Sequence, residues 1–195
     1  MHRILVVNSS TRQGRFSDGV ASWAVQRLKE RGDFLVDLLD LRDHPLPLFD
    51  GAPPAYHPRE YADENVARLA RRIDAADGYV VLVAEYNHGY TAALKNALDH
   101  TFAEWQRKPV TFIGWGNVGG ARAIEQLREV AVEFEMAPLR HAVHILPDVM
   151  RAARDRGGQA DETLLAPLEP RLELLANHLA WWTDALASAR TREDH

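Results

Sequence analysis

Short apolar runs alternate with amphipathic segments along the chain. A short apolar run bounded by polar residues predicts a buried strand, and apolar residues spaced three to four apart predict a helix with one buried face. Five strands are predicted, at Ile4–Val7, Phe34–Leu41, Tyr79–Ala84, Val110–Trp115 and Leu139–Leu146. Helices are predicted at Asp18–Arg31, Tyr61–Ala76, Thr91–Phe102 and Ala121–Glu135, with a polar stretch at Arg151–Asp161 before a last helix at about 163–189.

The alternation of strands and helices predicts an α/β fold with a parallel sheet and helices on both faces. No internal repeat or boundary divides the chain, so residues 1–195 are expected to form a single domain. Ligands of such sheets bind beyond the carboxyl ends of the strands, at the point where the strand order reverses. The loops after the first, third and fourth strands, here called loops one, three and four, are therefore the candidate site.

Loop one, residues 8–17, contains four hydroxyl side chains, two arginines and one glycine, and leads directly into a helix. A helix N-terminus offers unpaired N–H groups and a partial positive charge, and hydroxyls with a guanidinium complete a phosphate site. No Gly-Lys-Ser/Thr sequence occurs, so this is not a Walker A loop. The alternative is a polar turn in which Ser17 is the helix N-cap.

Loop three carries Glu85-Tyr86-Asn87-His88-Gly89-Tyr90 at a strand end, a composition suited to a flat heteroaromatic ligand. The alternative is that its aromatic residues simply close the end of the sheet. Loop four, Gly114-Trp115-Gly116-Asn117-Val118-Gly119-Gly120, fits G-x-G-x-x-G. The dinucleotide fingerprint, however, belongs after the first strand, with an acidic residue about 20 positions later. We therefore interpret loop four as a flexible loop whose backbone approaches the polar edge of a ligand.

Composition narrows the function. The chain has 195 residues and a net charge of −5, with both signs spread along it, which argues against nucleic acid or an anionic membrane as the main partner. The chain has no cysteine, so thiol catalysis and iron–sulfur clusters are excluded and redox chemistry requires a bound cofactor. The histidines lack ligand spacing, and we expect no metal site. No apolar run approaches a signal peptide or a membrane span, so a cytoplasmic location is expected.

Taken together, the three loops resemble the NADPH-dependent FMN reductase family, which includes quinone, azo-dye and chromate reductases. The resemblance covers about residues 1–150. It lies in Ser10-Thr11-Arg12-Gln13-Gly14-Arg15-Phe16-Ser17, in Glu85-Tyr86-Asn87 with Leu94-Lys95-Asn96-Ala97-Leu98-Asp99, and in Gly119-Gly120-Ala121-Arg122-Ala123 with Gln126-Leu127-Arg128. The chain departs from the family pattern at Ser9, Ala84 and Thr91, which replace a glycine and two prolines. None of the three changes removes a side chain expected to bond the cofactor.

The resemblance implies a flavodoxin-like three-layer sandwich with a five-stranded parallel sheet in the order 2-1-3-4-5, and FMN as the cofactor. Ser10, Arg12, Ser17 and Arg15 would hold the FMN phosphate, with Phe16 in the same motif. Glu85, Tyr86, Asn87 and His88 would border the isoalloxazine, and Gly116 and Gly119 would line its pyrimidine side.

The resemblance also implies that electrons pass from NADPH, or NADH, through FMN to quinones, azo compounds, flavin or similar small acceptors. Because the flavin performs the chemistry, no side chain is assigned as catalytic. The rival interpretation is an FMN-binding electron carrier or redox-responsive partner protein with no turnover. A homodimer or homotetramer is expected, since the Thr91–Phe102 helix is apolar on more than one face.

Overall fold

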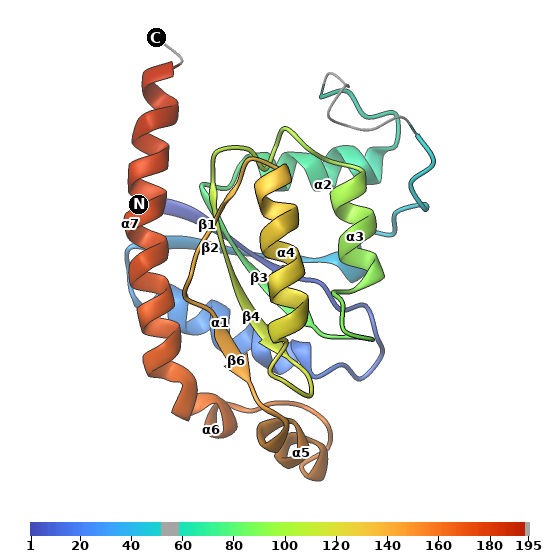
Figure 1. Ribbon diagram of the computed structural model, residues 1–195, viewed down its shortest axis with the longest axis vertical. Helices are drawn as coiled ribbons and strands as arrows, with labels where there is room; N and C mark the ends of the chain where they lie inside the picture. Colours follow the sequence, from blue (N-terminus) through green and yellow to red (C-terminus); the bar gives the residue numbers. More distant parts are fainter. Residues whose placement is uncertain (52–58, 194–195) are drawn as a thin grey trace.

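The computed structural model describes residues 1–51 and 59–193 (Figure 1); His57, one of the histidines considered above, lies outside the described residues. The sheet is built from β1 (His2–Asn8), β2 (Phe34–Asp40), β3 (Gly78–Ala84), β4 (Pro109–Trp115), β5 (Ala137–Pro138) and β6 (Val143–Ile145). The strand order is β2-β1-β3-β4-β5, β6 also pairs with β4, and every pairing is parallel. The predicted flavodoxin-like order is confirmed.

Helices cover both faces of the sheet and form three layers (Figure 1). One face packs on α1 (Ser17–Glu30) and α7 (Glu169–Glu193), and the other on α2 (Glu64–Asp74), α3 (Ala92–Asp99) and α4 (Ala121–Glu133). Alternate residues of a strand point to opposite faces, so Ile4 and Val6 belong to the first core, and Leu5 and Val7 to the second. All seven residues of β3 and of β4 are buried, as the unbroken apolar runs of a covered parallel sheet require.

The last predicted strand is broken into β5 and β6, which corrects the expectation of one strand over Leu139–Leu146. The main chain pairs with β4 as far as Leu139, whose N–H donates to the Val110 carbonyl. At His141 the Thr111 hydroxyl donates to the main-chain carbonyl at 2.6 Å, so a side chain replaces a main-chain partner there. The sheet therefore has two short strands beside β4 where one continuous strand was predicted.

Helix ends also differ from the predicted ones. The helix predicted from Tyr61 begins at Glu64, because the Asp63 carboxylate accepts hydrogen bonds from Asn65 N at 2.7 Å and Val66 N at 3.2 Å. The helix predicted to reach Phe102 ends at Asp99. Its exposed Lys95 and Asp99 form the i, i+4 ion pair that their spacing favours, at 2.6 Å.

The predicted polar stretch, Arg151–Asp161, is helical only in its first part. It contains the end of α5 (Pro147–Asp155) and precedes α6 (Glu162–Leu165). The sequence held a signal for α5, because Pro147 is at the first helical position and Asp148 is in the first turn. A 3₁₀ turn at Ala166–Leu168 then separates α6 from α7, so the last helix begins at Glu169. None of the helices in the part of the chain that the structure describes is long and apolar enough to cross a bilayer.

Candidate functional site

A pocket of about 220 Å³ lies at the carboxyl ends of the strands, where loops one, three and four meet α5. It is lined by Ser10, Arg12, Gly14, Arg15, Phe16, Ser17, Glu85, Tyr86, Trp115, Gly116, Met150, Arg154 and Gly158. Most of the residues predicted to bind a cofactor are thus brought to one place. Asn87, His88 and Gly119 are not among the residues that line it.

Ser17 lies at the start of α1 and is fully buried. It is the first residue of the helix and does not cap it, so the N-cap prediction is wrong; Phe16, at the cap position, has helical dihedral angles. The Ser17 hydroxyl has no hydrogen-bond partner among residues 1–51 and 59–193. An unpaired buried hydroxyl costs free energy, and this one lies in a pocket wall at a helix N-terminus, so it is suited to an anionic ligand.

Arg15 lines the pocket but is buried, and its guanidinium is bonded to protein groups. Its guanidinium donates to Asp18 at 2.7 Å, to both carboxylate oxygens of Asp40, and to the Ser10 carbonyl. Burial alone would lower the pKa of Arg15, but the bonds to Asp40 and Asp18 outweigh it and raise that pKa. Arg15 therefore fixes the shape of loop one, and its positive charge is already balanced by carboxylates.

Loops one and three are joined by side chains at the rim of the pocket. The Tyr86 hydroxyl and the Ser10 hydroxyl are 3.1 Å apart and share a hydrogen bond. The Arg12 guanidinium lies 5.8 Å from the centre of the Tyr86 ring, a cation–π distance. No carboxylate pairs with Arg12 among the described residues, so its charge is available to a ligand.

Residues 86–89 of loop three form a tight turn. Tyr86 and Gly89 exchange two main-chain hydrogen bonds, of 2.9 and 3.0 Å, and both residues between them, Asn87 and His88, have positive φ (50° and 71°). This is the pattern of a type I′ turn, which non-glycine residues adopt at a cost. The surrounding structure must hold the turn in place.

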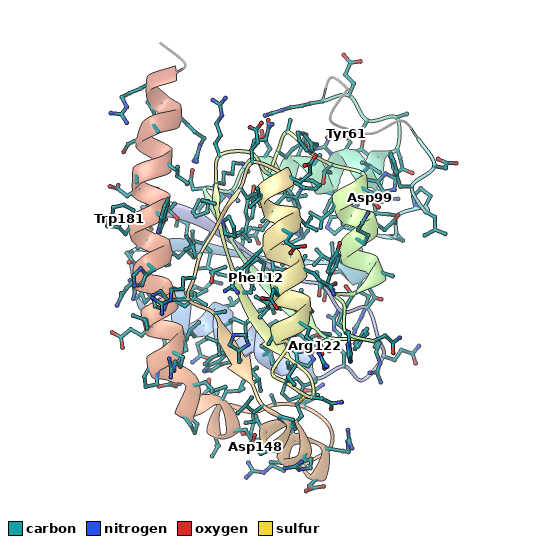
Figure 2. All side chains as sticks on the ribbon, viewed as in Figure 1. Tyr61, Asp99, Phe112, Arg122, Asp148 and Trp181 are labelled. Carbon is teal, nitrogen blue, oxygen red and sulfur yellow. The ribbon has the colours of Figure 1, made fainter. Side chains whose placement is uncertain are left out.

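Glu85 and His88 attach this turn to the start of α4. The Arg122 side chain bonds the buried Glu85 carboxylate, with Nε donating at 2.6 Å, and the Arg122 main-chain N–H donates to the same carboxylate at 3.2 Å. Arg122 Nη1 is also 2.9 Å from His88 Nε2, and Gln126 donates to the His88 carbonyl. Figure 2 labels Arg122 at the start of α4. Glu85 thus caps α4 as well as bordering the pocket.

Loop four brings Trp115 and Gly116 to the pocket, with the Trp115 ring 5.9 Å from that of Phe16. Gly119 faces away from the pocket. It has φ of +66°, and a Cβ there would lie 2.9 Å from His144 Cβ, so glycine is required for both its dihedral angle and its neighbour. His144 Nδ1 bonds the Gly119 carbonyl at 2.9 Å, which ties loop four to β6.

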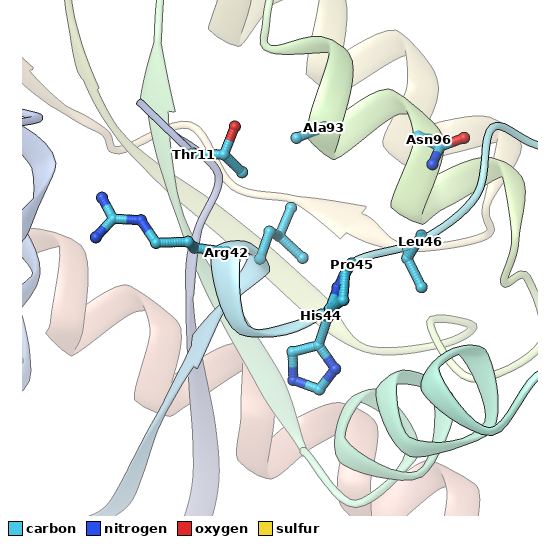
Figure 3. Close-up of a pocket in the computed structure, with 8 residues that line it drawn as sticks. Thr11, Arg42, His44, Pro45, Leu46, Ala93 and Asn96 are labelled. Carbon is cyan, nitrogen blue, oxygen red and sulfur yellow. The ribbon is translucent and has the colours of Figure 1, made fainter. Parts of the chain in front are cut away.

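A second cavity, of about 280 Å³, lies on the other side of loop one, between Thr11, the chain after β2 and α3 (Figure 3). Leu41, Pro45, Leu46 and Ala93 make its wall mainly apolar. The polar side chains around it do not all point into it, since the His44 ring points away from Thr11 and Ala93. Burial, with Arg68 and Arg72, lowers the pKa of His44. This cavity lacks loops three and four, so it does not have the features of the predicted cofactor site.

Five residues that line the first pocket were not predicted to bind a cofactor. Gly14 and Trp115 belong to loops one and four but were given no role. Met150 follows the last predicted strand, and Arg154 and Gly158 lie in the predicted polar stretch. Recognising Pro147 as a helix start would have placed α5 after the last strand, at the carboxyl edge of the sheet. Only the spatial structure brings that helix against loop one.

A parallel sheet in the order 2-1-3-4-5, with a phosphate-type helix N-terminus after β1 and an aromatic loop after β3, defines the class of flavodoxin-like flavoproteins. Residues 2–149 match the profile of the NADPH-dependent FMN reductase family, and the chain belongs to that family. It is an NAD(P)H-dependent flavoenzyme that uses FMN.

Named relatives agree with this assignment. The chain is similar to an NAD(P)H-dependent FMN reductase of Schizosaccharomyces pombe, with 34% identity over 75% of this chain and 74% of the relative. It is 30% identical to an FMN-dependent NADPH-azoreductase of Staphylococcus haemolyticus, over 66% of each chain. The names of these relatives refer to small-molecule electron acceptors.

Solved structures support the fold. The flavoenzyme FerB of Paracoccus denitrificans, an NAD(P)H:(acceptor) oxidoreductase, superposes with a TM-score of 0.69 at 23% identity, covering 95% of this chain and 98% of FerB. The apo form of an NADH:FMN oxidoreductase gives a TM-score of 0.67 at 16% identity, covering 92% of this chain and 90% of its own. At these identities the likeness concerns the fold alone.

Proposed function

We propose that this protein oxidises NAD(P)H through FMN held in the pocket of loops one, three and four, and passes the electrons to a small planar acceptor such as a quinone, an azo compound or free flavin. The observation that carries the proposal is the Ser17 hydroxyl, which is buried at the start of α1 in the wall of that pocket and has no partner within the described part of the chain. A phosphate would supply the missing partner and would benefit from the helix N-terminus.

Each wall of the pocket has a role in holding FMN. Ser10, Arg12 and Ser17 bind the phosphate, while Arg15 keeps loop one in shape and Phe16 gives the pocket an apolar side. Glu85, Tyr86 and Gly116 border the isoalloxazine. Asn87 and His88 form the turn that presents this edge, and Gly119 allows loop four to lie against His144.

The bound flavin supplies the hydride chemistry between nicotinamide and acceptor. The protein contributes positioning and exclusion of water, and no side chain acts as a general acid or base. Charge near the ring is balanced by the protein itself, because the Glu85 carboxylate that borders the pocket is paired with Arg122.

The acceptor and the cofactor are tested together. Purified protein, stripped of flavin, is titrated with FMN, FAD and riboflavin, and the FMN-loaded protein is then mixed with NADPH or NADH and a panel of quinones, azo dyes and free flavin. We expect FMN to bind more tightly than FAD, and steady consumption of nucleotide with at least one acceptor. Binding of FMN without nucleotide oxidation would favour the electron carrier; absence of FMN binding would overturn the proposal.

We also propose a homodimer or larger assembly. The Thr91–Phe102 segment has little exposed apolar surface for an interface. Leu94, Ala97 and Leu98 are buried within the chain, and Phe102 packs on Phe134. Exposed apolar side chains gather instead on α7, where Trp181 is 65% and Trp182 37% exposed; Figure 2 shows Trp181 on the outer side of that helix. Such patches are typical of interfaces.

We therefore expect a mass above 22.0 kDa by light scattering, reduced to the monomer mass by Trp181→Glu. A monomeric unmutated protein at micromolar concentration would end this proposal. A cytoplasmic location stays a prediction, to be checked by fractionation of the source cells.

A further inference from the structure

The helix α5 and the turn that follows it form the outer wall of the pocket, opposite loop one. Met150, Arg154 and Gly158 of this segment line the pocket. In Figure 1, α5 lies at the end of the sheet toward which β6 runs. Most of the segment falls beyond residue 149, where the match to the family ends. This wall is therefore a feature of the chain that the family assignment does not describe.

The wall is fixed tightly against the first turn of α1. A Cβ at Gly19 would lie 1.9 Å from the Ala160 carbonyl oxygen, so only glycine permits this backbone approach. The Gly158 N–H donates to the Ala153 carbonyl at 2.8 Å and closes the end of α5. Asp161 then caps α6 by accepting from Leu164 N at 2.9 Å. The position of Arg154 relative to Ser17 is thus set by main-chain contacts rather than by a free loop.

The three arginines that line the pocket differ in whether they form ion pairs within the protein. Arg15 gives its donors to Asp18, Asp40 and the Ser10 carbonyl. Arg12 and Arg154 are the two lining arginines whose guanidinium groups make no ion pair within residues 1–51 and 59–193. A phosphate dianion at the start of α1 would lie between one arginine from loop one and one from α5.

We propose that Arg154 binds the FMN phosphate together with Arg12, Ser17 and the first turn of α1, taking the place that sequence reasoning gave to Arg15. This rests on the proposed function, since it assumes that FMN occupies the pocket. The buried, unpartnered Ser17 hydroxyl marks where the phosphate lies, independently of Arg154. Arginine suits this role because its planar donor array matches phosphate oxygens.

The test compares FMN with riboflavin, which has the same ring and no phosphate. Flavin-free protein is titrated with each, and flavin fluorescence reports binding. Arg154→Gln should weaken FMN binding about tenfold to hundredfold, the usual effect of losing a charged hydrogen bond, and leave riboflavin binding within about twofold. Arg151→Gln is the matched control, because it removes the same charge from an exposed position of the same helix at a residue that does not line the pocket.

Arg154→Lys should lose less FMN affinity than Arg154→Gln, and raising the salt concentration should narrow the difference between Arg154→Gln and the unmutated protein. Equal losses for FMN and riboflavin would overturn the proposal, because they would show that Arg154 only supports the wall. Unchanged FMN affinity would overturn it too, while the proposed function would survive. Failure of the unmutated protein to bind FMN would instead remove the proposed function itself.

Discussion

The Thr91 hydroxyl donates a 2.9 Å hydrogen bond to the main-chain carbonyl of Ser9. These are two of the positions at which the chain departs from the pattern of its family, and here they contact each other. Thr91 Oγ1 also accepts from Leu94 N at 3.2 Å and so caps α3, while the Ser9 hydroxyl donates to the Leu82 carbonyl at 2.6 Å. One buried threonine therefore joins loop one to the end of loop three.

Thr91→Val should lower the free energy of unfolding by about 1–3 kcal/mol, because it leaves the Ser9 carbonyl and the Leu94 N–H without their partner in a buried place. Urea denaturation measures the change. Thr91→Ser retains the hydroxyl and should recover most of the loss. A loss for Thr91→Ser as large as that for Thr91→Val would contradict this account, since Thr91→Ser keeps the hydroxyl.

Arg12→Ala should weaken FMN binding about tenfold to hundredfold, because Arg12 is the proposed charged donor to the phosphate. Its main chain is held separately, through a bond from Arg42 to the Arg12 carbonyl, so loop one should keep its path. Nucleotide oxidation at saturating FMN should continue. Fluorescence titration gives the affinity, and an unchanged value would refute the assignment of Arg12.

Arg122→Gln should lower the free energy of unfolding by roughly 2–3 kcal/mol, because the Glu85 carboxylate, whose side chain is 3% exposed, loses its charged partner. The estimate is at the low end for a buried pair, since Arg122 is itself 36% exposed. Glu85→Gln combined with Arg122→Gln should recover part of the loss. A double-mutant cycle in urea measures the coupling; additive losses would show that the pair does not act as a unit.

Lys108 makes stability depend on pH in the alkaline range. Its ammonium group is buried among the carbonyls of Ile73, Asp74 and Glu104, and burial lowers its pKa to about 8. In the unfolded chain that pKa is about 10.4, so between these values the unfolded chain binds more protons and the free energy of unfolding rises with pH. We expect a gain of roughly 2 kcal/mol between pH 7.5 and 10.

Urea unfolding across that range measures the gain, and Lys108→Met should abolish it. Above about pH 10 the trend should reverse, because burial raises the pKa of Tyr79 well above its usual value and the unfolded chain then loses that proton first. The same slope in Lys108→Met and the unmutated protein would assign the pH dependence to other groups.

The sequence was sufficient for most of the fold because its strands are buried on both faces. Residues such as Val80–Val83 form an apolar run that predicts a strand without further context. The last strand was harder, because its break depends on the Thr111 hydroxyl from a neighbouring strand, a contact that local pattern does not contain. The ends of α2 and α3 depended on caps and on tertiary packing.

The candidate site was predictable where its chemistry lies in contiguous motifs, as in loops one and three. It was not predictable where a side chain bonds a residue that is distant in the sequence. Arg15 resembles a phosphate ligand in sequence, yet Asp40 on β2 binds it. Arg154 resembles a solvated arginine, and only the approach of Ala160 to Gly19 brings its helix to the pocket.

The outer wall of the pocket has a consequence for the order in which the protein matures. During synthesis β1 to β6 emerge before Met150, Arg154 and Gly158, and the sheet face beneath Leu172, Leu175 and Leu179 stays uncovered until α7 follows. A nascent chain that has paired all its strands thus exposes an apolar face, and its pocket still lacks the outer wall. Because the proposed site is completed only after the sheet, we expect tight binding of FMN to follow closure of the second core layer rather than to assist formation of the sheet.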